Sequence, residues 1–285
     1  SHMRFYRTAT PLTELMFRTT LEKGQFLDAV LATNLNPRLN ISLEHRGFRS
    51  QGQYDYQQSE SGAFRTTISY NSKDEKYVSN FFYTYQDYKF EENGGITKKE
   101  LQFESGDPEF LDRSRIDILH TNAKSRIVGR AFYYDQSYQW KSWIKFNHEL
   151  HYDSRFFQFQ QDAANSSYGG LFINGSIDDK IKKQSFENNL NITLNRSDKG
   201  AWSVGLKSLF TNYFTPSKLI TSEGIIPNQL KGQDVLLRGK TDEQFLGHRI
   251  SVEAELPIQT NVMGKALRAE LRPVKDSLNF SYSAR

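Results

Sequence analysis

The sequence predicts an all-β protein, an antiparallel up-and-down transmembrane β-barrel of about 12 strands. Three observations support this fold class. Apolar residues recur at every second position over long runs, tight turns alternate with long polar segments, and aromatic residues reach 14% although the mean hydropathy is only -0.68. Because a barrel wall needs an apolar residue only at alternate positions, a polar chain of 285 residues can still cover a lipid-facing surface.

The predicted strands each carry one apolar and one polar face. The most regular run follows Trp143, where even positions from Ile144 to Tyr152 are apolar, except for His148, and odd positions are polar. Its length matches the roughly 9 to 11 residues that a tilted strand needs to cross hydrocarbon. In chain order, the apolar positions of the other predicted strands are Leu27, Ala29, Leu31 and Leu35; Leu39, Ile41 and Leu43; Phe64, Ile68 and Tyr70; Phe81, Tyr83 and Tyr85; Leu190, Ile192 and Leu194; Trp202, Val204 and Leu206; Ile250, Val252, Ala254 and Leu256; and Leu267, Ala269 and Leu271.

The connections between these strands alternate in length. The predicted tight turns are Asn36-Pro37, Asn71 to Lys76, Asn195 to Gly200 and Asn261 to Lys265. The longer polar segments are Arg49 to Gly62, Gln86 to Arg113, Gln160 to Gln184 and Thr215 to Gly247. Short turns on one side and long loops on the other are typical of outer-membrane barrels. Leu119 to Ser142 has no clear place in this alternation, and Lys98 to Phe103 is the one helix candidate, a turn inside a loop.

Composition excludes several other classes of protein. The 37 Lys and Arg against 33 Asp and Glu give a net charge of +4 without a basic block, so no nucleic-acid partner is expected. The chain has no Cys, which excludes disulfides and thiolate sites. Its apolar runs are far shorter than the roughly 20 residues of a membrane-spanning helix. We expect no cofactor, no metal and no enzymatic activity; the expected partners are outer-membrane lipid and small polar solutes.

The polar faces of the predicted strands mix opposite charges, which suits the wall of a channel. A charged lumen of this kind predicts passive diffusion with weak ion selectivity. The residues predicted to line it are Glu44, Arg46, Lys145, Glu149, Asp153, Arg155, Arg249, Glu253, Arg268 and Glu270.

The histidines of the sequence His148-Glu149-Leu150-His151 resemble a pair of zinc ligands. A metalloprotease needs two His four residues apart on a helix, whereas His148 and His151 on a strand point to opposite faces. We therefore interpret both as parts of a barrel wall, with His148 on the lipid side near an interface.

The remaining motifs are best interpreted as loop features. Gly94-Gly95 and Gly169-Gly170 lack the Lys-Ser/Thr of a phosphate-binding loop. Asp107-Pro108-Glu109 with Asp112 does not follow the calcium-ligand spacing of an EF-hand. Asp112 to Arg115 is either the start of a strand with paired charges or a constriction element.

Six stretches of the first half together carry a resemblance to a known family. They are Thr10 to Thr19, Glu22 to Tyr54, Gly62 to Tyr77, Glu91 to Ile96, Glu104 to Ile118 and Val128 to Tyr138. Over roughly residues 5–140 the chain resembles the putative porin family of Bacteroidetes. The resemblance implies an outer-membrane β-barrel that serves as a passive diffusion channel. Members of that family are longer, with a signal peptide and further strands. We therefore expect residues 1–285 to form a single barrel domain that is an excerpt of a longer chain.

Three alternatives stay open at this point. The chain could be the barrel portion of an active TonB-dependent transporter, although the sequence shows neither a plug domain nor an energy-coupling box. It could be a soluble β-sandwich that binds carbohydrate through Tyr54, Tyr56, Tyr138 and Trp140. It could also be a barrel with a structural role and a blocked lumen.

Overall fold

The strands form a single antiparallel sheet in which each strand pairs with the next along the chain. The computed structural model describes residues 5–20, 23–162, 176–196, 200–222, 224–245, 248–260, 266–273 and 282–284. The strands are β1 (Leu12–Thr20), β2 (Gly24–Asn36), β3 (Leu39–Ser50), β4 (Ser59–Asn71), β5 (Tyr77–Glu91), β6 (Ala123–Lys141), β7 (Ile144–Gln161), β8 (Ile177–Arg196), β9 (Gly200–Thr221), β10 (Gly224–Phe245), β11 (His248–Gln259), β12 (Ala266–Pro273) and β13 (Tyr282–Ala284). The predicted all-β, up-and-down fold class is confirmed.

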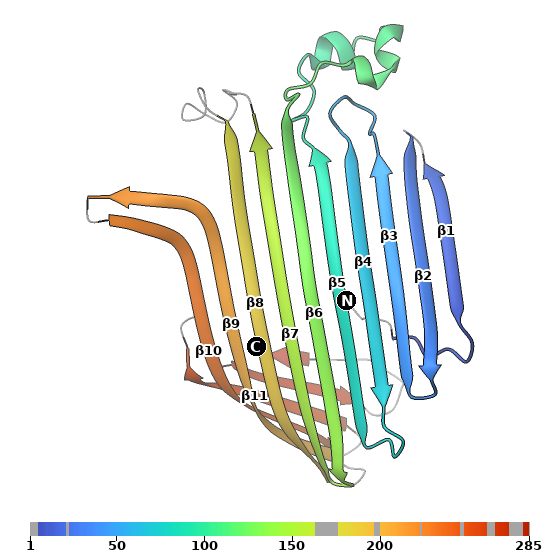
Figure 1. The fold of residues 1–285 in the computed structure, drawn as a ribbon. Helices are drawn as coiled ribbons and strands as arrows, with labels where there is room; N and C mark the ends of the chain where they lie inside the picture. The colour runs from blue at the N-terminus through green and yellow to red at the C-terminus, as the bar shows by residue number, and fades with distance from the viewer. Residues whose placement is uncertain are drawn as a thin grey trace.

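The sheet is curved and open. Figure 1 shows β1 to β8 side by side as a tall wall, with β11 passing behind it. Among the described strands, no pairing joins β1 to β13. This architecture is that of an incomplete β-barrel rather than of two packed sheets, so the β-sandwich alternative is wrong. Within the described residues, no helix is both long and apolar enough to cross a membrane.

The two faces of the sheet differ in chemistry and in crowding. We define the outer face by Leu43 and the residues in register with it, from Leu31 on β2 to Phe210 on β9. The opposite face is the inner face. Large apolar side chains stay exposed on the outer face, among them Leu31, Leu43, Phe64, Phe146, Leu190, Ile192 and Leu206. Most buried strand residues lie on the inner face, among them Ala32, Asn40, Ser42, Thr67, Asn189, Asp234 and Leu236. Side chains crowd together on the concave side of a curved sheet and are buried there. Because most buried strand residues lie on the inner face, the inner face is the concave one.

Short turns gather at one end of the sheet, here named the turn end (Figure 1). The other end, the loop end, carries the long β3–β4, β5–β6 and β7–β8 connections together with the short β1–β2 and β9–β10 ones. The predicted turns at Asn36-Pro37 and at Asn71 to Lys76 are confirmed, and the β8–β9 connection falls where Asn195 to Gly200 predicts a turn. Leu119 to Ser142 now has its place, because β6 occupies most of it and leads into a tight turn at 142–143.

One predicted loop is wrong. Thr215 to Gly247 is not a loop but the end of β9 and nearly all of β10, paired from Gly224 to Glu243. Because β10 adds a strand, the ends of β11 and β12 that flank residues 261–265 lie at the loop end, opposite to the end predicted. Residues 261–265 themselves lie outside the described residues.

The β5–β6 connection carries three short helices, at Lys99–Phe103, Pro108–Leu111 and Arg113–Arg115. The predicted helical turn is thus confirmed, whereas the interpretation of Asp112 to Arg115 as the start of a strand is wrong. An isolated bridge between Ile96 and Ile118 closes the base of this connection.

A polar clasp holds the same connection together. Asp117 accepts hydrogen bonds from Lys98 Nζ at 2.7 Å and Gln102 Nε2 at 3.0 Å, and its backbone N–H donates to Gln102 Oε1 at 2.8 Å. The Lys98 ammonium and the Gln102 amide hold the pKa of Asp117 below its ordinary value. The clasp therefore stays intact at neutral pH, where Asp117 is ionised.

Candidate functional site

Ion pairs line the inner face at its N-terminal side. Arg46 on β3 lies opposite Asp28 on β2, and Arg46 Nη2 contacts Asp28 Oδ2 at 2.6 Å. Glu44, two residues earlier, faces Arg65 on β4, with Glu44 Oε2 and Arg65 Nη1 3.3 Å apart. The arrangement follows from the period of two, since residues two apart share a face and their register partners meet them there.

A second charged group lies farther along the inner face. Lys207 Nζ on β9 is 3.6 Å from Glu187 Oε1 on β8 and 3.6 Å from Glu255 Oε1 on β11. The second contact reaches across β10, because both side chains are long and lie on the same face. Arg238 on β10 pairs with Glu253 on β11.

Acidic groups outnumber basic ones beside this network. Asp135 on β6 lies opposite Glu149 on β7, which in turn lies opposite Asn189 on β8. Asn189 Nδ2 donates to Glu187 Oε1 at 2.9 Å and approaches Glu149 Oε2 at 3.5 Å. Carboxylates of neighbouring strands are thus held side by side on the inner face, where water can solvate them.

Several polar atoms of the inner face are buried without a protein partner. They are Asn40 Oδ1, Glu44 Oε1, Gln161 Oε1 and Asn189 Oδ1. Buried polar atoms in native proteins nearly always have a hydrogen-bond partner. A wet interior supplies such partners through water, whereas an apolar filling does not.

The residues predicted to line a lumen fall on this face. The register of the paired strands places all of them on the same side of the sheet. Side chains are described there for Glu44, Arg46, Lys145, Glu149, Asp153, Arg155 and Glu253, whereas Arg249, Arg268 and Glu270 are placed by their backbone register alone. The predicted set omits six further charged residues of this face, of which Lys207 and Glu255 were expected on polar strand faces but not in the lining: Asp28, Arg65, Glu187, Lys207, Arg238 and Glu255. The polar alternation of β2, β4, β8 and β9 could have found most of them, but Arg238 lies on the strand that was mistaken for a loop.

The outer face carries an apolar band that ends in aromatic residues toward the turns. Trp140 and Trp143 flank the β6–β7 turn, and Lys141 Nζ lies 5.1 Å and 5.8 Å from their ring centroids. Both indole rings are about half exposed. Aromatic girdles of this kind mark the membrane–water interface of barrels.

His148 lies on the outer face, as predicted, and its polarity is satisfied there. Its ring nitrogens lie 3.0 Å from Gln136 Nε2 and 3.0 Å from Asn188 Oδ1. His151 lies on the other face, with its ring 6.3 Å from that of Tyr133. Within the part of the chain that the structure describes, no group of three or more potential metal ligands occurs.

The Asp and Gly motifs serve the connections. The carboxylates of Asp107 and Asp112 accept hydrogen bonds from the backbone of Glu109 and Ser114 and so begin two of the short helices. Gly94 has φ of 70°, and a Cβ there would lie 2.3 Å from the His120 ring. Gly169-Gly170 lies outside the described residues.

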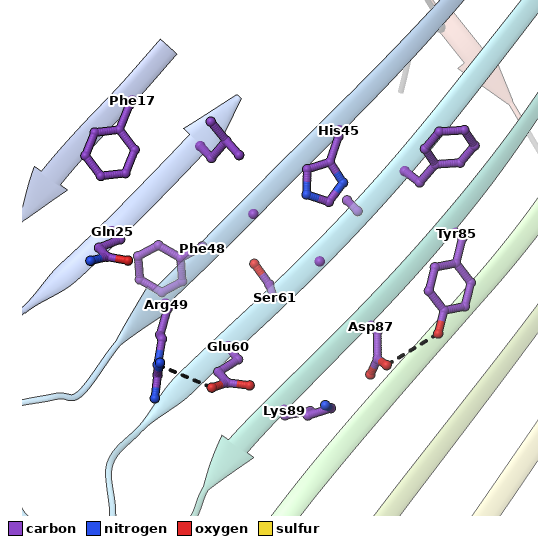
Figure 2. A pocket seen from close by; sticks show the side chains of 15 residues that line it. Phe17, Gln25, His45, Phe48, Arg49, Glu60, Ser61, Tyr85, Asp87 and Lys89 are labelled. Carbon is purple, nitrogen blue, oxygen red and sulfur yellow. Dashed lines mark hydrogen bonds and ion pairs between the residues drawn. The ribbon is translucent and has the colours of Figure 1, made fainter. Parts of the chain in front are cut away.

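Charged residues follow the apolar band at the loop end of the outer face. A groove of about 570 Å³ lies there, and Figure 2 shows the side chains that line it. Arg49 Nε is 3.3 Å from Glu60 Oε1, and the Tyr85 hydroxyl is 3.4 Å from Asp87 Oδ2. Arg126 Nη2 contacts the same Asp87 carboxylate at 2.6 Å. The outer face is therefore apolar toward the turn end and charged toward the loop end.

Comparisons with known proteins agree with this arrangement. The sequence model of a family described as "putative porin" matches residues 1–284. Among solved structures, the ferric-catecholate import receptor Fiu from K12 E. coli superimposes with a TM-score of 0.63 at 8% identity, over 98% of this chain and 46% of that one. The siderophore receptor PiuA from Acinetobacter baumannii gives 0.62 at 10% identity, over 97% and 45%. The ferric enterobactin receptor PfeA (Q482A mutant) from Pseudomonas aeruginosa gives 0.58 at 8% identity, over 92% and 41%.

The chain thus spans less than half the length of these receptors. At such low identity the likeness concerns the fold alone. No curated protein sequence matches the chain.

Proposed function

The chain belongs to the putative porin family and is an outer-membrane β-barrel protein, and from this premise we propose that it forms part of a passive channel for small polar solutes. The observation that carries the proposal is the charged inner face. Its ion pairs, its adjacent carboxylates and its buried polar atoms all favour contact with water rather than with a packed core. Passive diffusion of polar solutes requires an aqueous lumen, and the mixed charges favour weak ion selectivity.

We further propose that other strands of a longer polypeptide complete the wall. β1 and β13 each have a single neighbour among the described strands. In hydrocarbon, unpaired backbone groups on such an edge each cost several kcal/mol, so only a closed barrel is viable. Residues 1–285 would then be less than half of a chain as long as the matched receptors.

Planar-bilayer recording of the full-length gene product tests the channel. Stepwise conductance without an applied energy source is expected, with comparable permeation of small cations and anions. A folded, correctly inserted barrel that never conducts would contradict passive diffusion.

Charge variants on the inner face sharpen this test. Glu149→Gln combined with Glu187→Gln removes negative charge beside Lys207, so the reversal potential in a salt gradient should shift toward anion preference. Glu60→Gln is the matched control, because it removes a carboxylate from the outer face, where Glu60 pairs with Arg49. An equal shift in the control would show that the inner face does not line the conduction path.

A second candidate is the barrel portion of an active, TonB-dependent transporter. The superposition on siderophore and ferric-catecholate receptors favours it. This function would give silent bilayers and a solute uptake in cells that stops when the inner-membrane proton gradient is dissipated. Conductance in purified bilayers, in contrast, would favour the passive channel.

A further inference from the structure

A basic groove lies on the outer face beyond the apolar band. It has a volume of about 410 Å³ and is lined by Arg126 and Arg130 of β6, Ser154 of β7 and Lys182 of β8, with Tyr152 and Phe156 among its apolar walls. Ser154 is only 8% exposed and forms the floor. The groove thus combines cations, a hydroxyl and aromatic surface where the apolar band of the outer face meets its charged loop end.

The β-ladder register explains why these cations surround β7. Arg130 lies opposite Ser154, and Lys182 lies opposite Phe156, two residues farther along the same strand. Neighbouring strands are about 4.8 Å apart, so the Arg130 and Lys182 backbones stand on either side of β7 at about twice that spacing. Cations from both strands that flank β7 therefore line the groove that has Ser154 at its floor.

The negative charges near the groove are already engaged. Asp87 pairs with Arg126 at 2.6 Å, and Asp178 pairs with Lys180 at 2.5 Å. Arg130 lies over the Tyr85 ring, 5.5 Å from its centroid. With the carboxylates that the structure describes, neither Arg130 nor Lys182 forms an ion pair. The groove therefore carries uncompensated positive charge.

The depth of the groove is that of lipid headgroups. From Ile144 to Tyr152 the outer side of β7 crosses the apolar band, about the length needed to span hydrocarbon. Ser154 and Phe156 follow at once on the same face. A ligand held by Arg130 and Lys182 would consequently have hydrocarbon on one side and water on the other.

We propose that this groove binds the phosphate of an outer-leaflet lipid, with its acyl chains lying over Tyr152 and the apolar band. Guanidinium and ammonium groups are the side chains that bind phosphate best, and the apolar walls favour a lipid-borne phosphate over a free one. The inference rests on the proposed function for one point only, the orientation of the protein in the outer membrane, in which the loop end faces the extracellular side.

The test measures lipid binding by the full-length protein in detergent micelles, using native mass spectrometry. The probe is dioleoyl phosphatidic acid, compared with dioleoylglycerol, which has the same acyl chains and no phosphate. Phosphatidic acid should bind more tightly than dioleoylglycerol. Arg130→Gln and Lys182→Gln should each weaken its binding about fivefold, and the double variant roughly 25-fold. Lys183→Gln is the matched control, because Lys183 lies opposite Arg155 on the inner face, and it should leave binding unchanged.

Three results would overturn the proposal. Equal binding of dioleoylglycerol would show a merely apolar surface, and full competition by inorganic phosphate would show a free-anion site. An unchanged affinity in the double variant would show that these cations are not the site. The shifted gel mobility of the unheated barrel confirms that each variant is folded. Conductance, recorded separately, distinguishes a failure of the channel proposal from a failure of this one.

Discussion

Gly205 on β9 occupies a place where the sheet has no room for a side chain. A Cβ atom there would lie 2.2 Å from the Leu190 carbonyl oxygen and 2.2 Å from Asn191 Oδ1. Since the first of these atoms is backbone, Gly205→Ala should destabilise the barrel by about 1–3 kcal/mol, the usual cost of overpacking. Gly239 on β10 has no atom within 4 Å of its virtual Cβ, so Gly239→Ala should stay within about 0.5 kcal/mol of the parent.

Denaturant unfolding of both variants in the same vesicles measures the two free energies. Equal stability of the two alanine variants would contradict the close approach of β8 and β9 at this position.

His148 shows how one polar side chain fits an otherwise apolar alternation. The sequence marks it as the exception between Phe146 and Leu150, and this much was predictable. Its partners Gln136 and Asn188 come from β6 and β8, so they become visible only once strand register is known. Hydrogen bonds to both ring nitrogens remove most of the cost of placing the imidazole near lipid.

At the scale of the strand, the period of two predicted β2 to β5, β7 to β9, β11 and β12, but not β1, β6, β10 or β13. Among these four, β10 is the strand that the sequence predicts as a loop. That strand contains Pro227, Gly232 and Gly239, and its outer positions include Lys231 and Gln233. Turn-forming and charged residues are normally depleted from strands, so the segment has the composition of a loop. It is nonetheless a strand because β9 and β11 pair with it on both sides, a tertiary influence that local pattern does not reveal.

The candidate site was predictable to a similar extent. The alternation of side chains along a strand determines which charged residues share a face. It therefore predicts that Glu149 and Arg155 lie on the same face. Which charges meet depends on register and curvature, as in the reach of Lys207 to Glu255 across β10. Sequence alone therefore predicted which of these charges share the inner face, but not their ion pairs.

The two faces of β8 give a direct test of which one meets lipid. Leu190, half exposed in the middle of the apolar positions of β8, faces outward, and its neighbour Asn191 faces inward. Leu190→Lys should cost about 2–4 kcal/mol, the range for a lysine near the bilayer midplane, whereas lumen-facing substitutions are tolerated. Asn191→Lys is the matched control. Unfolding in vesicles measures both, and a greater loss at Asn191 would reverse the assignment of the faces.

At the scale of the whole molecule, strand parity bears on how the wall closes. Successive strands alternate in direction, so β1 and β13 run parallel, and their direct pairing would not be antiparallel. Bacterial single-chain barrels close with an even number of antiparallel strands. The proposed completion by further strands removes this mismatch and pairs the free edge of β1.

Residues 1–285 expressed alone should accordingly fail to form a monomeric barrel in vesicles, whereas the longer gene product should insert, resist protease and shift in mobility when unheated. The physical reason is the outer edge of β1, which has a single neighbouring strand among the strands that the structure describes, because an edge without a second strand cannot be solvated within hydrocarbon. Chemical crosslinking of the short chain separates the remaining cases. A crosslinked dimer that conducts would mean that a second copy supplies the missing edge, and a protease-resistant monomer would mean that the described strands close by themselves; either result contradicts completion by the same polypeptide.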